Sequence, residues 1–238
     1  LVFQRGSTMH SLVPRDENGR SNYRMGALRP NQFGVDDAHV VEYVASIAEA
    51  SGEFLQIVNF NLAGQQYAVA GTVAGLKALE EDATKRAAER GGKRPFMYVP
   101  GIDVPFHSTV LRSGVADFRT KLDERIPAEI DPAKLVGRYI PNLVARPFEL
   151  TREFAQSILD VVPSETVRVL LEVPGAWDAA LANTGALTRT LLIELLCWQF
   201  ASPVRWIETQ RVLLSTEEAA PGVAGLGVDQ VIEVGLGA

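Results

Sequence analysis

The chain has 238 residues, of which 47% are hydrophobic and 22% are charged, and its formal net charge is −6 at pH 7. This composition is typical of a globular protein with one large domain or two unequal ones. The acidic balance disfavours nucleic-acid partners, which require basic stripes. Apolar runs are shorter than the roughly 18 residues of a membrane span. A lone cysteine, Cys197, fits a reducing cytoplasm.

The first hundred residues predict a small α+β unit after a helical segment at 1–10. The predicted order is strand, helix, strand, strand, helix, strand, over 22–29, 38–51, 54–60, 65–70, 72–90 and 95–99. Asp36-Asp37 are expected to cap the first of these helices, and Gly91-Gly92 to end the second. This order is that of a ferredoxin-like split fold, which many unrelated functions use.

The remainder of the chain is predicted to be mostly helical. Helices are expected at 108–125, 150–162, 164–172, 186–200 and 203–214, with a loop and a helical turn at 174–185. A strand broken by Pro141 is expected at 138–145, and a last strand over 229–238. The segment 217–227 is expected to be flexible because of its composition.

Few motifs in the chain specify a chemistry. There is no H-E-x-x-H and no pair of cysteines, so we predict no metal site. The Gly-rich end lacks a complete G-x-G-x-x-G. No serine has glycine at both −2 and +2, as a nucleophile elbow requires. His107, in a loop after a predicted strand, is a candidate general base, and a packed structural histidine is the alternative.

Several segments, in order, resemble the malonyl/palmitoyl transferase domain of microbial type I fatty acid synthases and the free-standing malonyl-CoA:acyl-carrier-protein transacylases. They are "FQRGSTMHSLVPRDENGRSNY", "VNFNLAGQQYAVAGT", "GIDVPFHSTVLRSGVADFR", "GRYIPNLVARPFELTREF", "LLIELLCWQFASPVRWIETQ" and "VIEVGLGA". The resemblance covers nearly the whole chain. It implies an acyltransferase that moves acyl groups between CoA and carrier-protein phosphopantetheine through an acyl-serine intermediate.

The resemblance also implies site residues. His107 would be the general base, and the backbone carbonyl of Gln199 would orient it, as an aspartate does in serine proteases. Arg5 would bind the malonyl carboxylate through two hydrogen bonds. Asn61 would line the pocket, and the bulk of Phe106 would crowd a methyl branch on the substrate. Each residue alone has an ordinary structural alternative, such as a surface charge, a helix end or a turn.

The serine elbow of the family would precede Arg5. The resemblance therefore implies a fragment that starts after the nucleophilic serine and is inactive in isolation. The implied fold is α/β, a partial hydrolase-like acyltransferase subdomain with an inserted ferredoxin-like subdomain. Residues 1–22 and 103–238 would be parts of the large subdomain, and residues 23–102 would be the small one.

The resemblance implies substrates and partners but no tightly bound cofactor. Malonyl-CoA, acyl-CoA and carrier-protein phosphopantetheine would be substrates. An acyl carrier protein domain and other fatty acid synthase domains would be partners in a homo-oligomeric, cytoplasmic multienzyme, with no nucleic acid and no membrane. Two alternatives remain open: a non-catalytic structural or docking module of such a multienzyme, and a ferredoxin-like small-ligand sensor, which the long C-terminal half disfavours.

Overall fold

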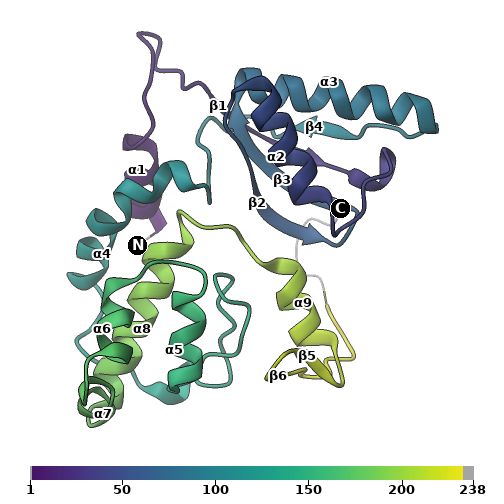
Figure 1. The fold of residues 1–238 in the computed structure, drawn as a ribbon. Helices are drawn as coiled ribbons and strands as arrows, with labels where there is room; N and C mark the ends of the chain where they lie inside the picture. The colour runs from purple at the N-terminus through teal and green to yellow at the C-terminus, as the bar shows by residue number, and fades with distance from the viewer. Residues whose placement is uncertain (1, 233–238) are drawn as a thin grey trace.

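The computed structural model describes residues 2–232, a mixed α/β arrangement (Figure 1). The α-helices are α1 (Val2–Ser11), α2 (Val40–Ser51), α3 (Val73–Arg90), α4 (Val115–Asp123), α5 (Arg152–Leu159), α6 (Glu165–Glu172), α7 (Ala176–Leu181), α8 (Thr184–Gln199) and α9 (Trp206–Leu214). The strands are β1 (Tyr23–Leu28), β2 (Leu55–Leu62), β3 (Gln66–Thr72), β4 (Phe96–Tyr98), β5 (Glu218–Ala220) and β6 (Val223–Ala224). Short 3₁₀ helices cover Pro30–Gln32, Thr109–Gly114 and Pro132–Lys134.

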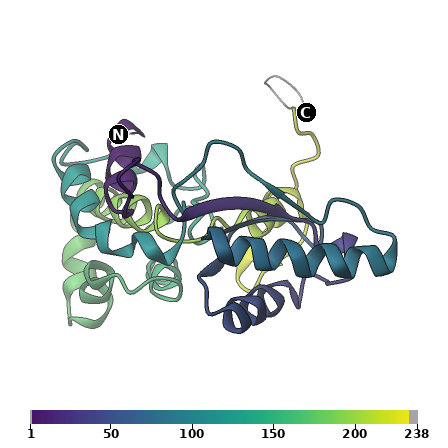
Figure 2. The same ribbon diagram turned by 90° about the horizontal axis from the view of Figure 1, so that it is seen from above.

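Strands β1 to β4 form an antiparallel sheet in the order β2-β3-β1-β4. Helices α2 and α3 lie on the same side of this sheet (Figure 2). Apolar side chains recur at helical spacing along both helices, and the resulting stripe is buried against the sheet. Val40 and Val44 supply it on α2, and Leu76 and Leu79 supply it on α3.

The other face of the sheet carries a small apolar cluster of Met25, Val58 and Ala70. Ile102 and Phe106, from the segment that follows β4, pack against this cluster. Successive strand residues point to opposite faces, so the sheet packs against other parts of the chain on both faces. The segment after β4 is therefore seated on the face that α2 and α3 leave uncovered.

Helices α1 and α4 to α8 surround a larger apolar core (Figure 1). Helix α8 is central to it and is buried on most sides, as expected for a helix that is apolar all round. Its buried residues are Leu187, Thr188, Leu191, Ile193, Glu194, Leu195, Cys197 and Trp198. The rings of Phe118 on α4 and Phe200 after α8 meet edge to face, with centroids 5.4 Å apart. Helix α1 lies alongside α4.

Glu194, on α8, is a charged side chain that is only 1% exposed. Its carboxylate accepts hydrogen bonds from Nε and Nη2 of Arg119 at 2.6 and 2.8 Å, from the Ser164 hydroxyl at 2.7 Å and from the Trp198 indole at 3.2 Å. A buried carboxylate requires such partners because burial removes its hydration. The network ties α8 to α4 and to the start of α6.

The strand expected at 138–145 is not formed, so that prediction was wrong. Pro141 has no amide hydrogen to donate to a sheet. Its carbonyl instead accepts hydrogen bonds from the amides of Val144 and Ala145, at 3.2 and 2.8 Å, which closes a turn. Ala145 completes the turn with a φ of 50°. The chain therefore reverses where a strand was expected.

Two further predictions near the C-terminus differ from the structure. Residues 217–227, expected to be flexible, contain the antiparallel hairpin of β5 and β6, and Gly222 provides a φ of 70° between the two strands. No strand forms at 229–232, and the rest of the predicted strand 229–238 lies outside the described residues.

The expected capping of α2 also differs from the structure. The residue before the helix is His39, and it makes no side-chain cap. Asp36 accepts hydrogen bonds from the amide and from Nδ1 of His39, at 3.0 and 2.6 Å. Asp37 accepts one from the hydroxyl of Tyr67. The two aspartates thus organise the turn ahead of α2 and the contact of that turn with β3.

No helix within residues 2–232 combines the length and the apolar character needed to cross a bilayer.

Candidate active site

His107 lies between β4 and α4, and its main chain is strained. Its φ of 61° is in the left-handed region, which costs a non-glycine residue about 1–3 kcal/mol and is frequent at functional sites. Its amide donates to the carbonyl of Phe200 at 3.2 Å, and its Nδ1 lies 2.8 Å from the carbonyl oxygen of Gln199. The contact that the resemblance implied between imidazole and carbonyl is present. Both contacts hold the ring at the end of α8.

Arg5, on α1, approaches the other ring nitrogen of His107. Its Nη2 lies 3.3 Å from Nε2. A guanidinium donates hydrogen bonds and cannot accept them, so Nε2 must be the unprotonated nitrogen. Nδ1 then carries the hydrogen and donates it to the Gln199 carbonyl. His107 is therefore a neutral base, held by one nitrogen, whose free lone pair faces a cation.

The electrostatics of the site favour that neutral form. Burial lowers the pKa of His107 below its ordinary value, and the charge of Arg5 lowers it further, while the hydrogen bond to the Gln199 carbonyl opposes both effects. Burial also lowers the pKa of Arg5, and no carboxylate of the described residues offsets this by pairing with it. A partly buried guanidinium without a carboxylate partner is suited to binding an anion.

A cavity of about 230 Å³ lies next to these residues. Its lining consists of Val2, Arg5, Phe118, Leu122, Leu196 and Gln199. The walls are therefore mostly apolar, and Arg5 and Gln199 supply the polar groups. This combination of apolar walls and a few placed polar groups is typical of small-molecule sites.

The remaining two predicted site residues, Phe106 and Asn61, take no part in these hydrogen bonds and do not line the cavity. Phe106 directly precedes His107 and is partly buried between the helical core and the apolar cluster on the sheet. Asn61 lies near the end of β2, and its carbonyl accepts a hydrogen bond from Nε2 of Gln210 at 2.8 Å. No hydrogen bond among the described residues joins Asn61 to the base, the arginine or the orienting glutamine. The structure thus brings three of the five predicted residues into contact.

Sequence reasoning missed two contacts that hold the chain on either side of His107. Oε1 of Gln56 on β2 accepts from the amide and the hydroxyl of Thr109, at 2.9 and 3.0 Å. Arg15 forms an ion pair with Asp103 at 2.5 Å. No motif marks these contacts, because their partners are 53 and 88 positions apart.

Possible nucleophiles next to the base are buried. The hydroxyl of Ser108 is inaccessible and donates to the carbonyl of Pro105 at 2.7 Å. The thiol of Cys197 is enclosed in the core, and burial raises its pKa to about 12, so it is not ionised at neutral pH. Among the described residues there is also no group of three or more His, Cys, Asp or Glu that could hold a metal ion.

Comparison with known proteins identifies relatives of the chain. Fatty acid synthase 2 of Mycosarcoma maydis is 41% identical over an alignment of 249 positions, which covers 90% of this chain and 7% of that protein. Fatty acid synthase subunit beta of Saccharomyces cerevisiae is 34% identical over 214 residues, which cover 72% of this chain and 10% of that protein. The chain thus spans only 7% and 10% of the length of these curated relatives. No family model matches it.

A solved structure has a similar fold. The malonyl CoA-acyl carrier protein transacylase of Burkholderia pseudomallei superposes with a TM-score of 0.52 at 21% identity, over 87% of this chain and 49% of that one. At this identity the likeness establishes the fold alone. The sequence relatives and the shared fold together show that the chain belongs to the type I fatty acid synthase family, as a segment with the acyltransferase fold.

Proposed function

We propose that this chain is the part of an acyltransferase that supplies the base and the carboxylate-binding residue for malonyl transfer between CoA and acyl carrier protein. One observation carries the proposal. His107 is held by the Gln199 carbonyl at one nitrogen, and its other nitrogen faces the guanidinium of Arg5, which has no carboxylate partner among the described residues. The anion-binding group thus lies in direct contact with the base, and it also lines an apolar cavity together with the glutamine that orients the base.

In the proposed reaction, Nε2 of His107 takes the proton of a serine hydroxyl while the serine oxygen attacks the thioester carbonyl of malonyl-CoA. The protonated imidazole then gives this proton to the departing CoA thiolate. The thiol of carrier-protein phosphopantetheine attacks the acyl-serine by the same route. Arg5 binds the malonyl carboxylate and thereby leaves Nε2, and the apolar cavity wall is the surface against which an acyl chain returned to CoA packs.

The serine of this proposal is supplied from outside the 238 residues. Two observations support that assignment. No serine of the chain occurs in a Gly-x-Ser-x-Gly sequence, which the strained elbow of such nucleophiles requires. Ser108, the serine adjacent to the base, is buried and uses its hydroxyl in a local turn.

We further propose that residues 23–102 are a ferredoxin-like subdomain inserted into a hydrolase-like acyltransferase subdomain, of which 1–22 and 103–238 are parts. The strand order β2-β3-β1-β4, with α2 and α3 on one side, supports this proposal. The substrates are malonyl-CoA, acyl-CoA and phosphopantetheine, and no cofactor is tightly held. The parent is a cytoplasmic homo-oligomer whose other fatty acid synthase domains and acyl carrier protein are the partners.

Radiolabelled malonyl-CoA tests the proposed function. The full-length protein that contains this segment is expected to acquire label on a serine and to pass it to acyl carrier protein. The isolated 238-residue chain is expected to remain unlabelled. A folded full-length protein that acquires no label would support the alternative, a non-catalytic docking module.

Replacing Arg5 with alanine is expected to shift the pH dependence of acetyl transfer to higher pH. Only unprotonated His107 acts as the base, so the rate falls as the pH drops through its pKa. The charge of Arg5 lowers that pKa, and its removal lets the pKa rise toward the ordinary value of 6.5. The measurement is kcat/KM for acetyl-CoA across about pH 5 to 8. Arg5→Lys keeps the charge and serves as the control. An acidic limb at the same pH in Arg5→Ala as in the parent contradicts the assignment.

A further inference from the structure

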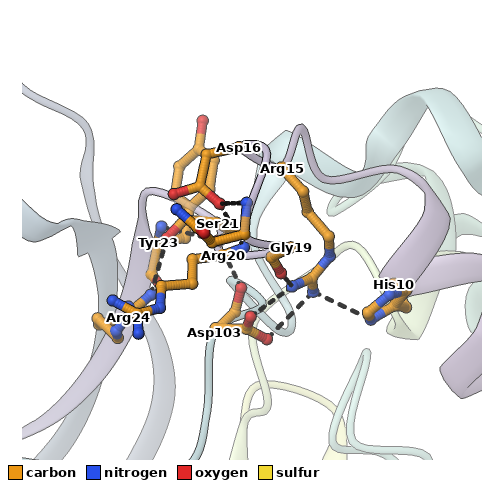
Figure 3. A network of polar contacts seen from close by, with 10 residues as sticks. His10, Arg15, Asp16, Gly19, Arg20, Ser21, Tyr23, Arg24 and Asp103 are labelled. Atoms are coloured by element: carbon orange, nitrogen blue, oxygen red, sulfur yellow. Dashed lines mark hydrogen bonds and ion pairs between the residues drawn. The ribbon is translucent and has the colours of Figure 1, made fainter.

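Arg15 joins two segments that are far apart in the sequence (Figure 3). Its Nη1 and Nη2 donate to the two carboxylate oxygens of Asp103, at 2.5 and 3.1 Å. Nη1 also donates to the carbonyl of Gly19 at 2.7 Å, and Nη2 donates to Nδ1 of His10 at 3.0 Å. Two-nitrogen pairing of this kind fixes orientation as well as distance, which a lysine cannot do.

The main chain of Asp103 is held by the same segment. The hydroxyl of Ser21 donates to the Asp103 carbonyl at 2.6 Å and accepts from the amide of Tyr23 at 2.9 Å (Figure 3). Arg15 and Ser21 are themselves bridged as antiparallel partners. Both the side chain and the carbonyl of Asp103 are therefore fixed by one loop, and β1 begins where that loop ends.

Asp103 is the upstream anchor of the segment that carries His107. Between them, Val104 and Pro105 are buried, so this short stretch has little room to move. Downstream, the amide and the hydroxyl of Thr109 donate to Oε1 of Gln56 on β2, at 2.9 and 3.0 Å. The left-handed backbone of His107 persists only if its surroundings hold it, and these two anchors lie on either side of it.

The same arginine also contacts the helix that carries Arg5. His10, which Arg15 meets through Nη2, is in the last turn of α1, five positions after Arg5. The Asp103 carboxyl is ionised and forms an ion pair, because its hydrogen bond from Arg15 lowers its pKa. Arg15 thus has direct contacts to both segments whose side chains meet in the candidate active site.

We propose that Arg15 and Asp103 are positioning residues that hold the helix of Arg5 and the segment of His107 in the relative placement that malonyl transfer requires. This inference rests on the function proposed above. Neither residue touches the substrate, and their effect is exerted through His107 and Arg5. Loss of the pair displaces both the base and the carboxylate-binding group. A displacement of about 1 Å in a catalytic group costs up to ~100-fold in rate.

The test uses the full-length protein and measures kcat and KM for malonyl-CoA and for uncharged acetyl-CoA. Asp103→Asn is expected to lower kcat for both substrates by about 10- to 100-fold, because His107 is misplaced. It is also expected to raise KM for malonyl-CoA alone, because only malonyl uses Arg5. Arg15→Lys, which keeps the charge and loses the paired geometry, is expected to behave in the same way. The exchanged pair, Arg15→Asp with Asp103→Arg, is expected to recover part of kcat.

Asp123→Asn is the matched control, because it breaks an ion pair of similar exposure with Arg189. Its kcat and KM are expected to stay within about twofold of the parent values. Values within about twofold for Asp103→Asn and Arg15→Lys would overturn the proposal. So would losses that vanish when rates are divided by the amount of folded protein. An inactive parent, or full activity in His107→Ala, would instead contradict the proposed function.

Discussion

Replacing His107 with alanine is expected to lower malonyl transfer by the full-length protein by about 10³-fold. Alanine removes the lone pair that faces Arg5, so no group of the site takes the serine proton. The fold is expected to persist, because the hydrogen bond from the backbone amide of residue 107 to the Phe200 carbonyl does not depend on the imidazole. Steady-state transfer of label from malonyl-CoA to acyl carrier protein measures the effect.

His39→Ala is the control for this experiment. His39 is an exposed histidine paired with Asp36 at the start of α2, and it makes no contact with the base. Its replacement is expected to leave the transfer rate within about twofold of the parent rate. If His107→Ala retained a rate within about tenfold of the parent, general-base catalysis by this residue would be excluded.

Replacing Glu194 with alanine is expected to lower the free energy of unfolding by about 3–5 kcal/mol. The substitution leaves Arg119, Ser164 and Trp198 without the carboxylate that accepts their hydrogen bonds. The unpaired donors of Ser164 and Trp198 then lie in the helical core, where water does not replace the lost acceptor. Urea denaturation of the full-length protein, followed at the transition of this segment, measures the change.

Two variants sharpen that measurement. Glu172→Ala removes an exposed carboxylate whose nearest ion pair, to Arg168, is 4.0 Å long, and it is expected to change stability by less than about 0.5 kcal/mol. Glu194→Gln keeps an acceptor oxygen, so its loss of unfolding free energy is expected to lie between those of Glu172→Ala and Glu194→Ala. A change below about 1 kcal/mol in Glu194→Ala would show that the buried network is not a main stabilising contact between α8 and α4.

Local patterns predicted most of the helices and the first four strands. Helices α2 and α3 follow from the spacing of their apolar residues, and the end of α3 follows from the glycine after it. Both signals are local in the sequence. The strand expected at 138–145 failed, because its apolar residues sit around a proline whose carbonyl closes a turn. The hairpin of β5 and β6 was missed since its residues, rich in Ala and Gly, have no strand pattern.

The candidate site was predictable only in part, and only through resemblance. His107, Gln199 and Arg5 lie more than ninety positions apart, so no spacing along the chain brings them together. The family pattern named all three, and the structure brings them into contact. It also named Asn61, which has no described contact with them. It was silent on Asp103, whose partner lies 88 positions away. Contacts of this kind depend on the tertiary fold and leave no local signature.

The central claim is that His107 and Arg5 act at one acyl-transfer site with separate roles. The most direct test is the rapid covalent labelling of the full-length protein by radiolabelled malonyl-CoA and, in parallel, acetyl-CoA. His107→Ala is predicted to lose labelling by both substrates. Arg5→Ala is predicted to lose labelling by malonyl-CoA and to retain labelling by acetyl-CoA, because only malonyl carries a carboxylate for the guanidinium. Undiminished malonyl labelling in both variants would contradict the account.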